Sequence, residues 1–178
     1  MSDPRGEYGF LDFFVRNGME KNLFADDAEA LSAAGAETTL KTYAIPATAL
    51  RNVGDFIRGK IKGRFAASGN ARRIRVLFGA ALVPIDSISS ASWDTMKFEI
   101  DFCIRMSAVG AQLADGKILG ILATAAGAAV GTAIDKVAGT EDETIANNLA
   151  IKTTGVAGSD VAIESVRIDL CGAGNIQV

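Results

Sequence analysis

Apolar and polar residues alternate along the chain, most regularly in the stretch MKFEIDFCIRM from Met96 to Met106. Every second residue is large and apolar, and the residues between are charged apart from Cys103. Successive side chains on a strand point to opposite faces, so the stretch predicts a strand with one buried and one solvent-facing side. A helix would spread the same apolar residues around its whole circumference. At about 3.3 Å per residue the strand spans roughly 35 Å, which suits the centre of a β domain.

Similar alternation continues through the chain after Thr38. Further strands are expected over residues 40–45, 56–65, 74–78, 117–122, a weaker segment ending near 137, 145–151 and 166–170. The second and third of these, joined by the turn AASGNA, are expected to form a hairpin, and residues 80–92 a Ser-rich connection. About eight strands separated by turn signals, with no helix pattern after residue 36, predict an all-β sandwich or barrel.

Residues 1–36 have a different pattern, and we expect them to form an N-terminal arm before a β-sandwich domain over residues 37–178. Three of the nine phenylalanines lie in a short apolar cluster, which consists of Phe10, Leu11, Phe13, Phe14 and Val15. The cluster packs either on the core of its own domain or on a neighbouring subunit or partner, because an isolated apolar cluster near a terminus would otherwise be exposed. Residues 22–36 form either a short strand followed by a loop, or a helix capped by Asp26 and Asp27.

The composition excludes several kinds of active site. The chain has no histidine, which is the commonest general base and the commonest zinc ligand. Cys103 and Cys171 are expected to behave as small buried apolar residues, and a bridge between them requires their strands to be neighbours. Phosphate-binding loops, GxSxG elbows and CxxC pairs are absent from the sequence. We therefore expect no catalytic residue, no cofactor and no metal ligand.

The charges give no bulk attraction to nucleic acid or to anionic membranes, since the net charge is −3. Cations nevertheless share one face of two expected strands: Arg58, Lys60, Lys62, Arg64, Arg73 and Arg75. These cations either pair with Glu99 and Asp101 across the sheet or form a patch that meets an acidic partner.

Two acidic runs and one uncharged run complete the candidate features. Asp26-Asp27 and residues 141–143 are expected to be solvated turns, because neither has the alternating oxygen ligands of a calcium loop. Residues 118–134 are uncharged but short for a membrane span and rich in Ala, Gly and Thr. Two strands joined by a turn of small residues are favoured there, so no membrane is expected as a partner.

Four stretches share a recognisable order of strands and turns: ETTLKTYAIPATAL, VGDFIRGKIKGRFAASGNARRIRVLFG, SWDTMKFEIDFCIRMSAVGAQ and SDVAIESVRIDLCGAG. A polar turn rich in Asn and Ala joins two strands, a glycine ends the second strand, and a tryptophan opens the long one. In the order of their strands and turns, residues 37–173 resemble bacteriophage virion proteins with a β-jelly-roll trimer domain. Such proteins occur as capsid decoration (cement) proteins and as head- or tail-fibre domains. The charged GKIKGR replaces small polar residues, which bears on the surface used and not on the fold.

The resemblance implies a jelly-roll-like β-sandwich that forms a homotrimer and has no enzymatic activity. The expected function is that of a decoration protein, made in the host cytoplasm and located on the outer capsid surface of the virion. Its expected partners are itself and the major capsid protein, and the arm residues Phe10, Leu11, Phe13, Phe14 and Val15 are the expected capsid-binding residues. A receptor-binding knob of a fibre stays open, although residues 1–36 hold no heptads for a shaft. A lectin-like or small-ligand jelly roll of cellular origin also stays open.

Overall fold

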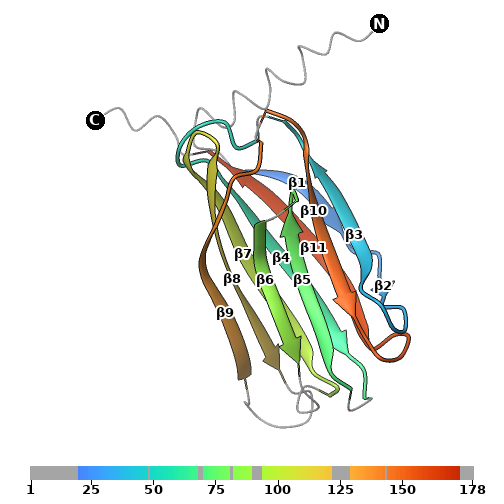
Figure 1. Cartoon of the computed structure of the whole chain (residues 1–178). Coiled ribbons are helices and arrows are strands. Elements are labelled where there is room, and N and C mark those ends of the chain that lie inside the picture. The colour runs from blue at the N-terminus through green and yellow to red at the C-terminus, as the bar shows by residue number, and fades with distance from the viewer. Residues whose placement is uncertain are drawn as a thin grey trace, which may run out of the picture.

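Two antiparallel β-sheets pack face to face in the computed structural model of the chain, which describes residues 20–47, 49–67, 70–80, 82–89, 94–121, 129–142 and 144–172. Figure 1 shows both sheets running along the long axis of the domain. Within the described ranges the structure has eleven strands and no helix. The predicted all-β sandwich is therefore confirmed, and the expected number of about eight strands is too low.

The larger sheet is built around the long alternating strand. Its strands follow the order β1 (Glu20–Asp26), β11 (Val161–Cys171), β4 (Phe56–Phe65), β7 (Lys97–Ala108), β8 (Ala111–Ile121) and β9 (Ala129–Gly139), and β2 (Ala30–Leu31) also pairs with β11. Strand β7 lies between β4 and β8, with Ile100 opposite Ile61 on one side and Ile118 on the other. The apolar set of β7 is buried, so the predicted central strand and its inward face are confirmed.

The smaller sheet contains β3 (Thr38–Ile45), β10 (Asn147–Thr154), β5 (Arg72–Phe78) and β6 (Leu82–Ser89) in that order. The predicted hairpin of residues 56–65 and 74–78 is wrong, because β4 lies in the larger sheet and β5 in the smaller one. Each of these strands has one apolar face, and both faces are buried when the chain crosses between the sheets. The predicted connection over residues 80–92 is also wrong in part, since it contains β6.

The core lies between the two sheets and consists of inward side chains from both. Ile57, Ile61 and Ile100 of the larger sheet and Val76 and Ile151 of the smaller one are fully buried. Gly59 and Gly63 of β4 also face this core, where the rings of Phe102 and Phe98 lie directly over them. A side chain at either glycine would occupy the position of a ring, so these glycines allow the close approach that their place in a strand predicts.

Residues 20–36, which the sequence analysis assigns to the arm, include two strands of the larger sheet. Strand β1 pairs with the second half of β11 and β2 with its first half. Of the two alternatives for residues 22–36, the strand followed by a loop is therefore confirmed and the helix is wrong. Side chains of β11 supply partners for β1, since Asn22 Nδ2 donates to Asp169 Oδ1 over 2.8 Å.

Candidate functional site

The expected capsid-binding residues Phe10, Leu11, Phe13, Phe14 and Val15 lie outside the residues that the structure describes. Their role therefore remains a prediction. The chain enters the described part at Glu20, whose partner in the sheet is Cys171, the last residue of β11. The start of β1 and the end of β11 consequently lie at the same end of the sandwich, which we call the terminal end (Figure 1).

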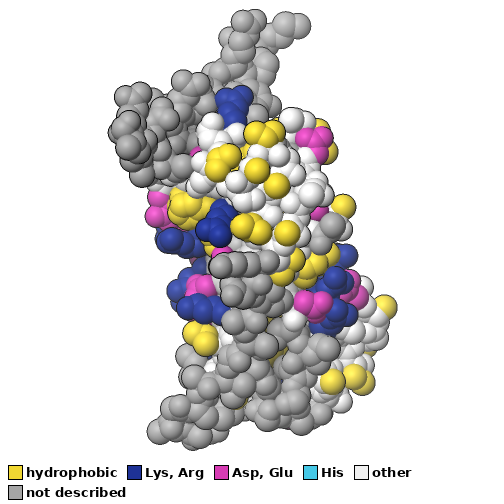
Figure 2. All heavy atoms as spheres, turned by 60° about the vertical axis from the view of Figure 1, so that its left-hand side comes forward, with side chains coloured by type: hydrophobic (Ala, Val, Ile, Leu, Met, Phe, Trp, Pro, Cys, Tyr) yellow, Lys and Arg dark blue, Asp and Glu magenta, His cyan; other side chains and the backbone are white. Residues whose placement is uncertain are grey.

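Most cations of the predicted basic face on β4 have acidic partners. Lys60 Nζ lies 2.8 Å from Glu99 Oε1, and Lys62 Nζ lies 3.9 Å from Glu99 Oε2. Arg64 bridges two carboxylates, at 2.8 Å from Glu29 and 2.6 Å from Glu164. The interpretation that cations pair across the sheet is thus confirmed for Lys60 and Lys62. Figure 2 shows basic and acidic side chains next to one another, as expected of a solvated face.

Arg73 and Arg75 belong to a different surface, because β5 lies in the smaller sheet. Their expected pairing with Glu99 and Asp101 is therefore wrong, and Asp101 instead lies 3.6 Å from Lys117 of β8. Arg73 makes two parallel hydrogen bonds of 2.6 Å to Asp86, and this contact lowers the pKa of the Asp86 carboxyl.

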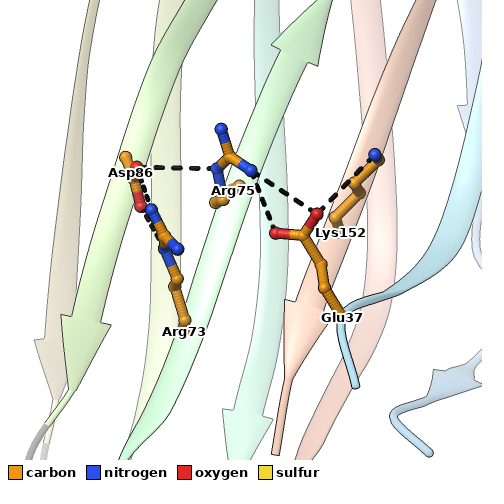
Figure 3. A network of polar contacts seen from close by, with 5 residues as sticks. All are labelled: Glu37, Arg73, Arg75, Asp86 and Lys152. Carbon is orange, nitrogen blue, oxygen red and sulfur yellow. Dashed lines mark hydrogen bonds and ion pairs between the residues drawn. The ribbon is translucent and has the colours of Figure 1, made fainter.

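The pair of Arg73 and Asp86 belongs to a network of five charged residues on the smaller sheet, drawn in Figure 3. Arg75 Nη1 lies 3.1 Å from Glu37 Oε1, and Lys152 Nζ lies 3.7 Å from Glu37 Oε2. Arg75 also approaches Asp86 at 3.5 Å. Two carboxylates thus face three cations, which leaves little uncompensated charge to attract an acidic partner.

Glu141 is buried, and its predicted solvated turn is wrong. Its carboxylate accepts hydrogen bonds from the backbone amides of Ala80 at 3.0 Å and Leu82 at 3.1 Å. The buried side chain of Gln112 in turn holds the Glu141 backbone, donating to its carbonyl over 2.9 Å and accepting from its amide over 2.8 Å. These bonds fix the loop after β9 to the β5–β6 turn, so the carboxylate has a structural role.

Asp26 joins the two sheets at one edge, which also contradicts its predicted place in a solvated turn. Its Oδ2 atom accepts hydrogen bonds of 2.8 Å from Lys41 Nζ and from Tyr43 Oη, both on β3. The hydrogen bond from Lys41, followed by that from Tyr43, lowers the pKa of Asp26 to about 2. Burial raises the pKa of the Tyr43 hydroxyl, and its hydrogen bond to Asp26 raises this pKa further. The ring of Phe24 packs 5.1 Å from that of Tyr43, so this edge is closed by apolar and polar contacts together.

Cys103 and Cys171 are free thiols on strands that are not neighbours, since β4 lies between β7 and β11. Burial is the main cause that raises the pKa of both thiols. A bridge between them would need Cα atoms within about 7 Å, whereas alternate strands of a sheet lie roughly 10 Å apart. The alternative of a disulfide is therefore wrong, and the thiols have low nucleophilic character.

The described part of the chain offers little for small-molecule chemistry. A pocket lined by Ile45, Leu50 and Ile145, among others, has a volume of about 10 Å³, which is the space of roughly one water molecule. No group of three acidic or cysteine side chains that could hold a metal ion is found in the described ranges. In the same ranges no helix is long and apolar enough to cross a membrane. The uncharged run over residues 118–134 contributes instead to β8 and β9, as the sequence favoured.

Comparisons with known proteins give distant structural similarities. No protein-family model matches the chain. No curated protein matches it either. Among solved structures, the chain is similar to one from the infectious bursal disease virus Gx strain, with 14% identity over 88% of this chain and a TM-score of 0.35. The VP2 subviral particle of infectious bursal disease virus gives 11% identity over 88% and a TM-score of 0.37. This chain spans about a third of the length of either protein, at 32% and 33%, and similarities of this size carry no argument about function.

Proposed function

We propose that the chain is a non-enzymatic structural protein of a virus particle. In this proposal it is a trimeric capsid decoration protein that binds the outer capsid surface and stabilises the shell through its N-terminal arm. Its partners are two further copies of itself and the major capsid protein. The proposal combines the sequence resemblance to phage virion proteins with the sandwich that the structure describes.

The observation that carries the proposal is a core that is already filled without the N-terminal phenylalanine cluster. The buried apolar residues of this core run from Tyr43 to Leu170 in the described chain, and Leu23 and Phe24 of β1 pack at its margin. Both sheets contribute inward side chains with almost no exposed surface. This supports a role for Phe10–Val15 outside the domain, because three aromatic rings that the core does not need favour burial in a partner surface.

The outer faces of the two sheets support the same proposal. Lys60, Lys62 and Arg64 of β4 and Arg73 of β5 lie 2.6–3.9 Å from carboxylates, so these faces have the mixed charge of a solvated surface. The described pocket is too small for a metabolite. A domain of this kind acts as a rigid body that presents a binding segment, and trimerisation multiplies the strength of three such contacts.

Co-sedimentation with capsids tests the proposal. The full chain and a chain that starts at Glu20 are mixed with capsids of the encoding virus from which this protein has been removed. We expect the full chain to pellet with the capsids and the shortened chain, still folded by circular dichroism, to stay in the supernatant. Equal binding by both chains would contradict the role of the arm.

Solution mass separates the trimer from the other parts of the proposal. At micromolar concentration we expect a mass three times the 18.5 kDa of one chain. A monomer at that concentration would contradict the trimer and leave the binding by the arm to be judged by sedimentation.

A further inference from the structure

Large aliphatic side chains are exposed on three separate loops at the terminal end of the sandwich. Val53 lies in the loop between β3 and β4 and is 58% exposed, Val109 lies in the β7–β8 turn and is 84% exposed, and Ile145 lies in the loop before β10 and is 56% exposed. Single exposed apolar residues are common on protein surfaces. Three that come from different loops at one end of a domain are a candidate interaction surface.

The register of the larger sheet places these loops next to the exit of the N-terminal segment. Glu20 pairs with Cys171, Cys171 with Phe56 and Phe56 with Arg105, so these residues form one row across four strands. Met106 follows Arg105 directly, and its backbone bonds to Gly54 and Asp55 over 2.9 and 2.8 Å. The loop with Val53 therefore ends at Asp55, one residue beyond the row that Glu20 starts, and Val109 lies four residues beyond Arg105 of the same row.

Buried polar groups hold two of the three loops in place, those of Val53 and of Ile145. Asp55 Oδ2 accepts hydrogen bonds from the amides of Asn52 at 2.7 Å and Arg51 at 3.1 Å, which fixes the loop of Val53. The bonds between Gln112 and Glu141 fix the loop that leads to Ile145, and Gln112 is the second residue of β8 after the β7–β8 turn. Loops held in one conformation lose little entropy when a partner covers them, so the surface is preorganised for binding.

The length of the N-terminal segment limits where its aromatic cluster can act. Val15 lies five residues before Glu20, and five residues reach at most about 17 Å. Strand β7 has 12 residues, so the sandwich is about 40 Å long at roughly 3.3 Å per residue. Phe10, ten residues before Glu20, reaches at most about 35 Å. A partner surface that binds the whole cluster, Val15 included, must therefore come within about 17 Å of the start of β1 at the terminal end.

We infer that the terminal end of the sandwich faces the capsid, and that Val53, Val109 and Ile145 bind an apolar patch of the same shell that takes the arm. This inference rests on the proposed function and adds a second contact to it. The arm supplies reach, and the three loops supply a fixed surface that sets the orientation of the domain on the shell.

Paired substitutions in the full chain test the inference. The double variant Val53→Asp with Val109→Asp places two charges on the proposed surface, and Val156→Asp is the matched control. Val156 is 64% exposed and lies in the β10–β11 loop at the opposite end, where the amide of Ala157 donates to buried Asp160 over 2.7 Å. All substituted side chains are exposed, so we expect unchanged thermal midpoints. If the double variant unfolds, Val109→Ser with Ile145→Ser takes its place.

Co-sedimentation titrations with stripped capsids of the encoding virus give the result. We expect the double variant to bind about tenfold or more weakly, and the Val156→Asp chain to bind within about twofold of the unsubstituted chain. Equal binding by all three overturns the inference while the proposed function stands. Failure of the unsubstituted chain itself to bind overturns the proposed function.

Two further measurements test whether a second copy of the chain or the chain's own arm covers the surface instead of the capsid. If the double variant changes the solution mass but not the capsid affinity, the surface binds a second copy and the inference is overturned. Amide exchange at residues 51–55 and 107–111 is also compared, without capsids, between the full chain and a chain that lacks residues 1–19. Faster exchange in the shortened chain would mean that the chain's own arm covers the surface, and the inference is likewise overturned. Slower exchange at these residues only when capsids are added supports it.

Discussion

Replacement of Gly59 by alanine should destabilise the sandwich through a single steric conflict. Gly59 lies on the inner side of β4 directly opposite Phe102 of β7. A Cβ atom at this position would lie 1.9 Å from Cζ and 2.1 Å from Cε1 of the Phe102 ring. The ring is almost fully buried and cannot turn into solvent, so either the ring or strand β4 must shift.

The expected cost is about 2 kcal/mol. An added carbon in a packed core costs roughly 1–3 kcal/mol, and the smaller entropy of the unfolded chain offsets about 0.4–1 kcal/mol of this. Phe102→Ala alone should cost about 3–5 kcal/mol, because it leaves a cavity between the sheets. In the double variant the new methyl group has room, so its cost should fall below the sum of the single costs by roughly 1–3 kcal/mol.

Urea unfolding at equilibrium measures all four chains, with Gly158→Ala as the control. A Cβ atom at Gly158 would meet no atom within 4 Å, so this variant should stay within about 0.5 kcal/mol of the unsubstituted chain. The m-values should agree across the series. Costs that simply add in the double variant, or a Gly59→Ala chain as stable as the control, would refute the steric explanation.

The remaining predictions concern the carboxylates of Glu141 and Asp26 and the two thiols. Glu141→Ala should lose about 2–4 kcal/mol in urea unfolding because two backbone amides lose their acceptor, and Glu141→Gln should lose less; equal losses would contradict the role of the carboxylate. The Lys41 and Tyr43 hydrogen bonds hold the pKa of Asp26 at about 2 in the folded chain, below its ordinary value of 3.8, so its contribution to stability is present above the unfolded pKa and is lost as the pH falls from about 4 through 2. Asp26→Asn should remove this loss at a cost of about 1–2 kcal/mol at neutral pH, and an unchanged acid slope in denaturation would argue against it. After mild oxidation, peptide mapping should find Cys103 and Cys171 unlinked, and a bridged peptide would disprove the register.

Alternation was enough to predict the strands that have one charged and one apolar face. The stretch from Met96 to Met106 is such a strand, and its partners carry the same signal, as in residues 56–65. The pattern predicts which face is buried but not which sheet receives it. Strand β5 has the same alternation whether it pairs with β4 or packs across from it, so the predicted hairpin was wrong.

Pro84 explains why β6 was missed. A proline lacks the amide needed for pairing on both sides, so residues 80–92 were expected to form a connection. Strand β6 lies at the edge of the smaller sheet, where a proline is tolerated. The apolar residues around it, Leu82, Val83 and Ile85, were the available signal.

Carboxylates with structural roles show where sequence patterns give least information. Asp26 and Glu141 lie in runs of adjacent acidic residues, which are typical of solvated turns. Their partners are distant in sequence: Tyr43 for Asp26, and the β5–β6 turn with Gln112 for Glu141. Such partners depend on the tertiary fold, so only the assembled sandwich reveals these structural roles. The predicted arm contacts, by contrast, need a partner surface to be tested.

The number of copies in the virus particle tests the central proposal most directly. Purified virions of the encoding virus are digested, and peptides of this chain and of the major capsid protein are quantified against labelled standards. A decoration protein predicts a copy number of the same order as that of the major capsid protein. A copy number of only a few per particle, as for a fibre tip, or absence from the virion would contradict the proposal.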